Sequence, residues 1–127
     1  MRDGDAAADL PARIAATIEP GGRALIPTGF AIAVPLGAAG LVLSRSGMSL
    51  NQGVAVANSP GLIDSGYRGE IKVILVNHSA ETVEIERGQR IAQLMVIPVP
   101  ALRFLVVDEL PPAPDDRGAQ GFGSSGA

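Results

Sequence analysis

The hydrophobic and polar positions of this chain follow the pattern of short β-strands separated by turns. Residues 82–86 (TVEIE) alternate apolar and polar side chains, as a strand with one buried face does. The run IKVILV at 71–76 is apolar almost throughout, which predicts a strand covered on both faces. Only one short helical turn, at 47–52, is expected. The pattern predicts strands at 13–18, 23–27, 29–35, 39–44, 53–58, 69–77, 82–86, 90–98 and 102–107.

Glycine and proline content supports an all-β fold, because 16 Gly and 10 Pro residues in 127 favour many tight turns over a helical bundle. Aromatic residues make up only 3% of the chain and Trp is absent, so the core must be built from Val, Ile, Leu and Ala. We expect one folded core at 1–109, a Pro-rich linker at 110–116 and a Gly/Ser-rich arm at 117–127. From composition alone, the arm is either a disordered tail or a lid that contacts phosphate.

Cysteine content excludes several classes of site, whereas net charge alone excludes little, because an acidic chain can still bind a polyanion through local Arg residues. The formal charge is −3 and the pI about 5, so the basic excess of a general nucleic-acid binder is missing. The absence of Cys removes disulfides, thiolate zinc sites and Cys nucleophiles. His78 is the only histidine, which leaves little room for a Ser-His-Asp triad. Any general base is therefore expected to be a carboxylate.

One uncharged stretch, residues 24–44, is long enough for a membrane helix, which needs roughly 20 apolar residues. Pro27, Pro35 and three glycines interrupt it, so buried strands joined by turns fit better. No secretory signal is recognisable at the N-terminus. The sequence thus predicts a soluble, cytoplasmic protein with neither a membrane nor a nucleic-acid partner.

The most polar turn of the chain is GLIDSGYRGE at 61–70, between the apolar runs VAVANSP and IKVILV. A β-hairpin turn would suffice at this place. One interpretation is a decorated hairpin with Arg68 and Glu70 in ion pairs. The other makes Asp64 a base for a water molecule and Tyr67 a flat platform for a ligand at the mouth of a pocket. For this motif alone the two interpretations are evenly balanced.

Three further motifs are weak when taken singly. Arg45, Ser46 and Gly47 suit a phosphate contact, but an ordinary polar turn is the better interpretation of these residues alone. Asp9 is a cap, a buried acceptor or a group that holds the water of a Mg²⁺ ion. Gln93 lies among apolar neighbours and needs a partner, which is either structural or a ligand.

In order, these motifs are specific. Asp-Leu near the start, then RSG, GLIDSGYRGE, RGQRIAQL and finally RGAQGFGSSG resemble the five ordered motifs of the trimeric dUTPase family, over residues 6–126. The resemblance implies a jelly-roll-like β-barrel subunit in a homotrimer, with three active sites at subunit interfaces. It implies Mg²⁺-dependent hydrolysis of dUTP to dUMP and pyrophosphate, which limits uracil in DNA and supplies dUMP for dTMP synthesis. The alternatives are a dCTP deaminase-like enzyme and a non-catalytic regulatory or binding protein with the same fold.

The resemblance also implies roles for the residues that would surround the nucleoside. Asp64 would orient and deprotonate the water that attacks the α-phosphorus. Tyr67 would stack under the deoxyribose and leave no room for a 2′-OH. Asn58 and backbone groups of the GLIDSGYRGE segment would read the uracil edge, and Phe122 would close over the uracil ring.

Around the triphosphate, the resemblance implies that Asp9 holds Mg²⁺ through water and that Gln93 bonds the α-phosphate region. The RSG motif would hold phosphates from a neighbouring subunit, and the C-terminal arm would grip the β- and γ-phosphates. The implied substrate-binding residues are Arg45, Ser46, Gly47, Asn58, Gly61, Ile63, Tyr67, Lys72, Gln93, Arg117, Phe122, Gly123, Ser124 and Ser125.

The chain departs from the family pattern at three places. Ala7 stands where the first motif usually has Gly, and Ser44 replaces the Pro that usually precedes Arg-Ser-Gly. Family members normally have an additional strand before the first motif, which here lies close to Met1. We expect these departures to affect local geometry and trimer packing more than catalysis.

Overall fold

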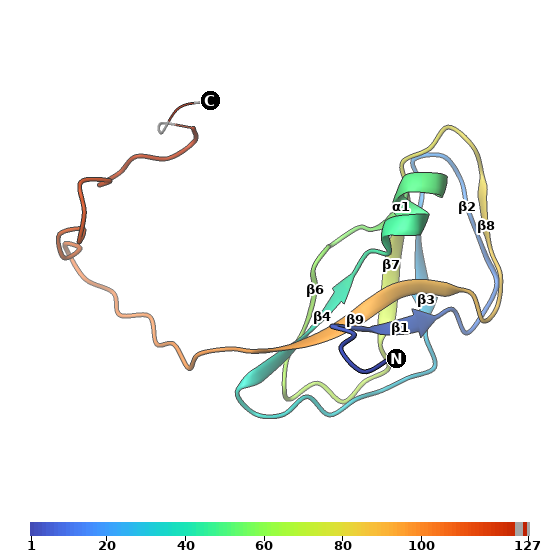
Figure 1. Ribbon diagram of the computed structural model, residues 1–127, viewed down its shortest axis with the longest axis horizontal. Coiled ribbons are helices and arrows are strands. Elements are labelled where there is room, and N and C mark those ends of the chain that lie inside the picture. Colours follow the sequence, from blue (N-terminus) through green and yellow to red (C-terminus); the bar gives the residue numbers. More distant parts are fainter. Residues whose placement is uncertain (124–125, 127) are drawn as a thin grey trace.

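The computed structural model describes residues 1–123 and 126, and in that part of the chain nearly all regular structure is β (Figure 1). The all-β prediction is therefore confirmed. A single short helix, α1, lies at one end of the body, where a helical turn was expected. The elements are β1 (Ala8–Pro11), β2 (Ala16–Ile18), β3 (Arg23–Pro27), β4 (Ala38–Leu43), α1 (Ser46–Gln52), β5 (Val54–Val56), β6 (Gly61–Ile63), β7 (Lys72–Asn77), β8 (Val83–Ile85) and β9 (Arg90–Pro98).

The strands form three antiparallel sheets whose order crosses back and forth along the chain. One sheet has the order β1-β9-β4-β6, a second has β3-β7-β5, and β2 pairs with β8 in a two-stranded ribbon. Because neighbours in a sheet are distant in sequence, most contacts are long-range, as in a jelly-roll-like β fold. The chain thereby brings its N-terminal strand beside β9, so that Asp9 faces Gln93 in register.

The core is shared by all three sheets and is purely aliphatic. Ile18, Ile26, Leu75, Ile85 and Ile91 are each at most 1% exposed. The buried apolar cluster of the described residues consists of Val, Ile, Leu and Ala, as composition predicted, together with Met48, which was not predicted. Strand β8 has the expected alternation, with both of its Val and Ile side chains inside and Glu84 outside.

Strand β7 differs from its prediction, because only one of its faces is covered within the chain. Val73 and Leu75 are buried, whereas Ile74 and Val76 are only partly buried. On the neighbouring strand β3, Leu25 lies opposite Ile74 and is 59% exposed. An apolar run therefore marks a strand that this chain alone does not bury on both sides.

The end of β7 is fixed by the fully buried Asn77. Its amide nitrogen donates to the carbonyls of Ile18 (2.9 Å) and Glu81 (2.7 Å), and its side-chain oxygen accepts from the amide and hydroxyl of Ser79. A buried amide with all of its hydrogen bonds made contributes to a unique packing arrangement rather than weakening it. Asn77 thus joins β7, β2 and the turn before β8.

Two predicted strands are absent. At 29–35, Gly29 has φ +80°, which breaks an extended run, and the backbone of this segment bonds to Ile71 instead of a neighbouring strand. At 102–107 the residues are all exposed, and no other strand lies beside them within the described residues. The predicted strand at 13–18 is reduced to β2. The sequence pattern missed β1 and β6, which have only four and three residues.

No helix in the described ranges is both long and apolar enough to cross a bilayer; α1 has seven residues.

Candidate active site

The GLIDSGYRGE segment is not a hairpin turn. The apolar runs on either side of it do pair, as β5 and β7, with Val56 opposite Leu75 and the Ala57 amide bonded to the Ile74 carbonyl at 2.8 Å. Between them the chain leaves that sheet, and β6 pairs with β4 in the four-stranded sheet. Residues 58–71 therefore form an excursion from one sheet to the other, and the hairpin prediction is wrong.

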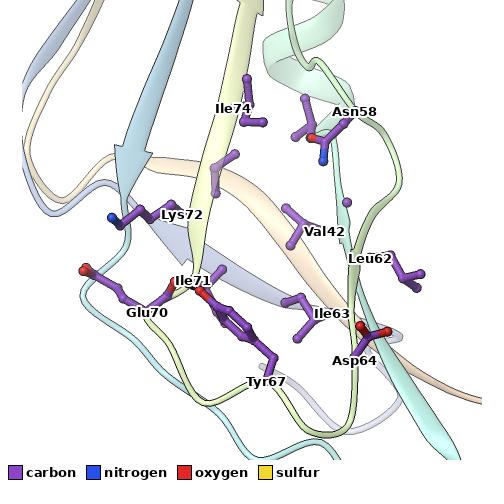
Figure 2. Close-up of a pocket in the computed structure, with 13 residues that line it drawn as sticks. Val42, Asn58, Leu62, Ile63, Asp64, Tyr67, Glu70, Ile71, Lys72 and Ile74 are labelled. Atoms are coloured by element: carbon purple, nitrogen blue, oxygen red, sulfur yellow. Dashed lines mark hydrogen bonds between the residues drawn. The ribbon is translucent and has the colours of Figure 1, made fainter.

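The excursion borders an open pocket of about 200 Å³, which residues of β4, β5 and β7 also line (Figure 2). Asp64 and Tyr67 lie at one end of it and Asn58 at the other, with Val42 and Ile63 between them. Polar side chains around an aliphatic floor are typical of small-molecule sites. The predicted residues Asn58, Gly61, Ile63, Asp64, Tyr67 and Lys72 all line this pocket.

The loop that carries Asp64 and Tyr67 is held by its own hydrogen bonds. The Tyr67 amide donates to the Asp64 carbonyl at 3.1 Å, which closes a turn. The Arg68 guanidinium donates to the carbonyls of Ser65 (2.7 Å) and Tyr67 (2.9 Å). Arg68 thus supports the backbone of the turn and not a carboxylate, whereas Glu70 is in an ion pair with Arg13. The prediction of an ion pair is therefore correct for Glu70 and wrong for Arg68.

The side chains of this loop differ in exposure according to their role in packing. Gly61 and Ile63 are buried, whereas Leu62 between them is exposed (Figure 2). Asp64 is exposed, so its carboxylate is free to meet water and ligand. Tyr67 is 45% exposed, which leaves part of its ring surface available at the pocket.

A second cluster contains Asp9, Arg45 and Arg90. Arg45 donates from Nε to one carboxylate oxygen of Asp9 at 3.1 Å, and Arg90 Nη1 lies 3.5 Å from the other. Arg45 also donates to the Arg90 carbonyl at 3.3 Å. The four-stranded sheet brings these three residues together, because β9 pairs with both β1 and β4. Gln93 on β9 thereby lies opposite both Asp9 and Leu43. Gln93 is half-buried.

Ser46 and Gly47 extend this cluster as the first two residues of α1, for which Arg45 is the N-cap. Both residues are exposed. The motif is therefore a strand-to-helix turn, with its backbone and hydroxyl open to solvent and its Arg held toward β1 and β9. None of the described residues of this turn lines the pocket at residues 58–71.

The Asp9 carboxylate suits one mode of Mg²⁺ binding only. Within the described residues no group of three His, Cys, Asp or Glu side chains could hold a metal ion. Mg²⁺ often uses one or two carboxylates together with waters and substrate phosphates. Asp9 is the candidate for this mode, and its partly exposed carboxylate already contacts Arg45 and Arg90.

The third group of predicted residues lies in the C-terminal segment, which runs away from the body (Figure 1). Arg117, Phe122 and Gly123 are exposed, and Arg117 bonds only locally, to Asp115 and Gln120. Ser124 and Ser125 lie outside the described residues. Within one chain the predicted site is therefore divided among three places.

Comparison with known proteins assigns the chain to a family. The dUTPase family model matches residues 1–126. The chain belongs to the dUTPase family. Over 124 residues it is 50% identical to the deoxyuridine 5′-triphosphate nucleotidohydrolase of Corynebacterium diphtheriae, covering 97% of this chain and 80% of that protein. The protein with the same name from Anaeromyxobacter sp. is 48% identical, over 98% of this chain and 83% of that protein.

Solved dUTPase structures share this fold. The dUTPase of Staphylococcus bacteriophage 80alpha, solved with dUPNHPP, has a TM-score of 0.91 and 28% identity, covering 100% of this chain and 89% of that one. A variant of the phage phi11 dUTPase of S. aureus has a TM-score of 0.79 and 25% identity, over 86% of this chain and 87% of that one. That structure is described as revealing the coordination of a structural Mg(II) ion.

Sequence reasoning assigned no role to two residues that contact the predicted site, Arg90 within the RGQRIAQL motif and Arg13 outside the motifs. Arg90 is three positions before Gln93, and residues three apart on a strand point to opposite faces, so nothing indicated a shared cluster. Arg13 was placed in a predicted strand and not beside the pocket. Its contact with Glu70 joins positions that are 57 apart in sequence, which no local pattern reveals.

Proposed function

We propose that this protein hydrolyses dUTP to dUMP and pyrophosphate. The observation that carries the proposal is the pocket beneath residues 58–71, where the dUTPase motif places a carboxylate, an aromatic ring and an amide side chain around an aliphatic floor. The family match over residues 1–126 and the relatives named as dUTP nucleotidohydrolases support it. A structural neighbour was solved with dUPNHPP, a name that denotes a dUTP analogue.

In the proposed reaction, the oxygen of a water molecule attacks the α-phosphorus while Asp64 accepts a proton from that water. The bond from the α-phosphorus to the bridging oxygen breaks, and pyrophosphate leaves with that oxygen. A positioned carboxylate base contributes about 10²–10⁴-fold to such a step. The exposure of Asp64 at the pocket mouth supports this role, because its carboxylate is open to water.

The other pocket residues would bind the nucleoside. Tyr67 would lie under the deoxyribose, where a 2′-OH would collide with the ring. Asn58, at the far end of the pocket, would bond the uracil edge together with the backbone of β6, and Ile63 and Gly61 would form the floor. Lys72, at the start of β7, lies on the pocket wall as a cation for the nucleotide.

The phosphates would be held by the other two groups of residues. Gln93 and the Arg45-Ser46-Gly47 turn provide amide, guanidinium, hydroxyl and backbone donors. Asp9 would hold Mg²⁺ through water, and the bound ion would neutralise phosphate charge. From the arm, Phe122 would cover the uracil ring, while Arg117, Gly123, Ser124 and Ser125 would bind the β- and γ-phosphates.

A homotrimer with shared sites is part of this proposal. The nucleoside pocket, the Arg45 cluster and the arm are separate in one chain, so a second and third copy would be needed to bring them together. Exposed apolar side chains support such an assembly, since Phe104 and Val106 on the C-terminal segment are 95% and 102% exposed. The cytoplasmic location stays a prediction.

The first experiment measures pyrophosphate release with Mg²⁺ on dUTP, beside UTP, dTTP and dCTP. We expect fast release from dUTP only, and loss of activity when the metal is chelated. Absence of turnover by a folded protein would refute the proposal. Ammonia release from dCTP would instead establish the deaminase alternative, which the names of the relatives do not favour.

A further inference from the structure

The side chain of Glu70 connects the excursion at 58–71 to two other parts of the chain. Its Oε1 accepts a hydrogen bond from the backbone amide of Gly29 at 2.9 Å. The same oxygen lies 3.5 Å from Nη1 of Arg13. Glu70 is the last residue of GLIDSGYRGE and lines the pocket, yet the proposed reaction gives it no role.

The Gly29 amide is a well-fixed donor. Its neighbour Thr28 is 3% exposed and donates its hydroxyl to the Ile71 carbonyl at 2.8 Å. Backbone bonds from Thr28 to Ile71 (3.1 Å) and from Ile71 to Phe30 (2.8 Å) hold residues 28–30 against the loop. Gly29 itself has φ +80°, a conformation that L side chains rarely adopt.

Glu70 also contacts Tyr67, but through its backbone. The Tyr67 hydroxyl donates to the backbone carbonyl of Glu70 at 2.8 Å. The ring crosses directly over Gly69, where a Cβ atom would lie 2.5 Å from the Tyr67 hydroxyl oxygen and 2.7 Å from Cζ. The Gly-Glu pair that ends the motif therefore makes space for the ring and anchors its hydroxyl.

We propose that Glu70 is a positioning residue: its side chain, bonded to the Gly29 amide, fixes the backbone carbonyl that accepts from Tyr67 and thereby sets the place of the Tyr67 ring in the pocket. We call the chain of contacts from Gly29 through Glu70 to Tyr67 the latch. The consequence is that discrimination between deoxyribose and ribose depends on Glu70. This consequence rests on the proposed function, because it requires Tyr67 to lie under the sugar.

The bond to the amide, and not the ion pair, should carry most of the effect. Arg13 is 57% exposed at its side chain and the contact is long, so water screens it strongly. The 2.9 Å bond from the Gly29 amide to a carboxylate is a charge-assisted hydrogen bond. Glutamine loses the charge assistance but keeps an oxygen acceptor at the same position, so it should preserve most of the latch.

The chain offers a direct probe of the ring, because Tyr67 is its only tyrosine and Trp is absent. Tyrosine fluorescence therefore reports on Tyr67 alone, with or without enzymatic activity. In Glu70→Ala and in Glu70→Met, which keeps the length but lacks the acceptor, we expect lower fluorescence anisotropy and stronger quenching by acrylamide. Glu70→Gln and Arg13→Ala should stay close to the wild type.

Kinetics supply the second measurement, on the same full-length variants at matched folded fraction. Loss of the latch should lower the dUTP-over-UTP ratio of kcat/KM about tenfold, mainly through a higher KM for dUTP, because misplacement of a substrate platform weakens orientation. For Glu70→Gln the ratio should stay within about threefold of wild type.

Two outcomes would overturn the latch. One is unchanged fluorescence and unchanged sugar preference in both Glu70→Ala and Glu70→Met. The other is a Glu70→Gln variant as impaired as Glu70→Ala, which would show that the negative charge, and not the acceptor, matters. If wild type does not hydrolyse dUTP, the proposed function fails while the fluorescence comparison still decides whether Glu70 holds Tyr67.

Discussion

The excursion at 58–71 and the C-terminal segment at 99–123 carry different parts of the same motif set, but they are built in opposite ways. The excursion is fixed by strand pairing at β6, by the Arg68 bonds to its turn and by the contacts of Glu70. The C-terminal segment bonds to the body through the Val99 amide, which donates to the Gly37 carbonyl at 2.8 Å. Beyond it, no hydrogen bond joins residues 100–123 to the rest of the described chain.

The difference indicates a division of labour within the proposed site. A pocket that must select one base and one sugar needs fixed walls, since misplacement reduces discrimination. A segment that closes over a triphosphate must first let it enter, and a segment with few contacts to the body can do so. Selection is thus expected to depend on the body and closure on the arm.

The largest expected effect comes from the fixed region. Asp64→Asn should lower kcat on dUTP by about 10³-fold, because the carboxylate that takes the proton is lost. Binding of a non-hydrolysable dUTP analogue, measured by calorimetry, should remain. Asp108→Asn changes an exposed carboxylate outside the pocket and serves as the matched control. Near-normal turnover by Asp64→Asn would refute its role as base.

Removal of residues 117–127 tests the other side of the comparison. We expect kcat/KM for dUTP to fall by roughly 10²-fold, because donors to the phosphates and the cover over the site are lost. The melting temperature and the molar mass in solution should not change, because this segment makes no hydrogen bond to the body within the described residues. Dissociation into monomers would contradict the assignment of these residues to closure alone.

The smallest effect on activity is expected from Asn77→Ala, although its effect on stability should be large. The change leaves the buried carbonyl of Ile18 without its partner, which should cost about 2–4 kcal/mol of unfolding free energy. Turnover should stay near normal at temperatures where the variant is folded. Urea denaturation at fixed protein concentration measures the loss, with the exposed neighbour His78→Ala as control. Equal losses in both variants would contradict the role of Asn77.

Much of the body could be predicted from local pattern. The strands at 23–27 and 90–98 have the expected bounds, and the core has the aliphatic composition that the sequence requires. Turn and strand propensities act over a few residues, so they are readable in a single sequence. The all-β fold and the family follow from these patterns and from the ordered motifs.

The partners of the strands could not be predicted in the same way. β6 has three residues, and its pairing with β4 joins Leu62 to Leu41 across 21 positions. The same limit applies to the contact between Asp9 and Arg45, which depends on β9 lying between β1 and β4. Long-range pairing is decided by global topology, and a local pattern contains no record of it.

The C-terminal segment shows a different limit. The run LRFLVV at 102–107 has the composition of a strand, but strand propensity is expressed only where another edge is available for pairing. The division into a core at 1–109, a linker and an arm stays a prediction, because the last strand of the described chain ends at Pro98. The roles of the individual phosphate-binding residues also stay predictions.

The excursion between β5 and β7 has a consequence for protein engineering. Its two ends are adjacent, since the Ala57 amide bonds to the Ile74 carbonyl, and the paired strands close the base without help from the residues between. The excursion is therefore closed at its base by paired strands, while Ile63 and Ile71 within it belong to the buried core. A library that varies the exposed positions of this excursion, while retaining β6, Asp64, Tyr67 and the buried Ile71, would explore new nucleobase preferences without redesign of the sheets.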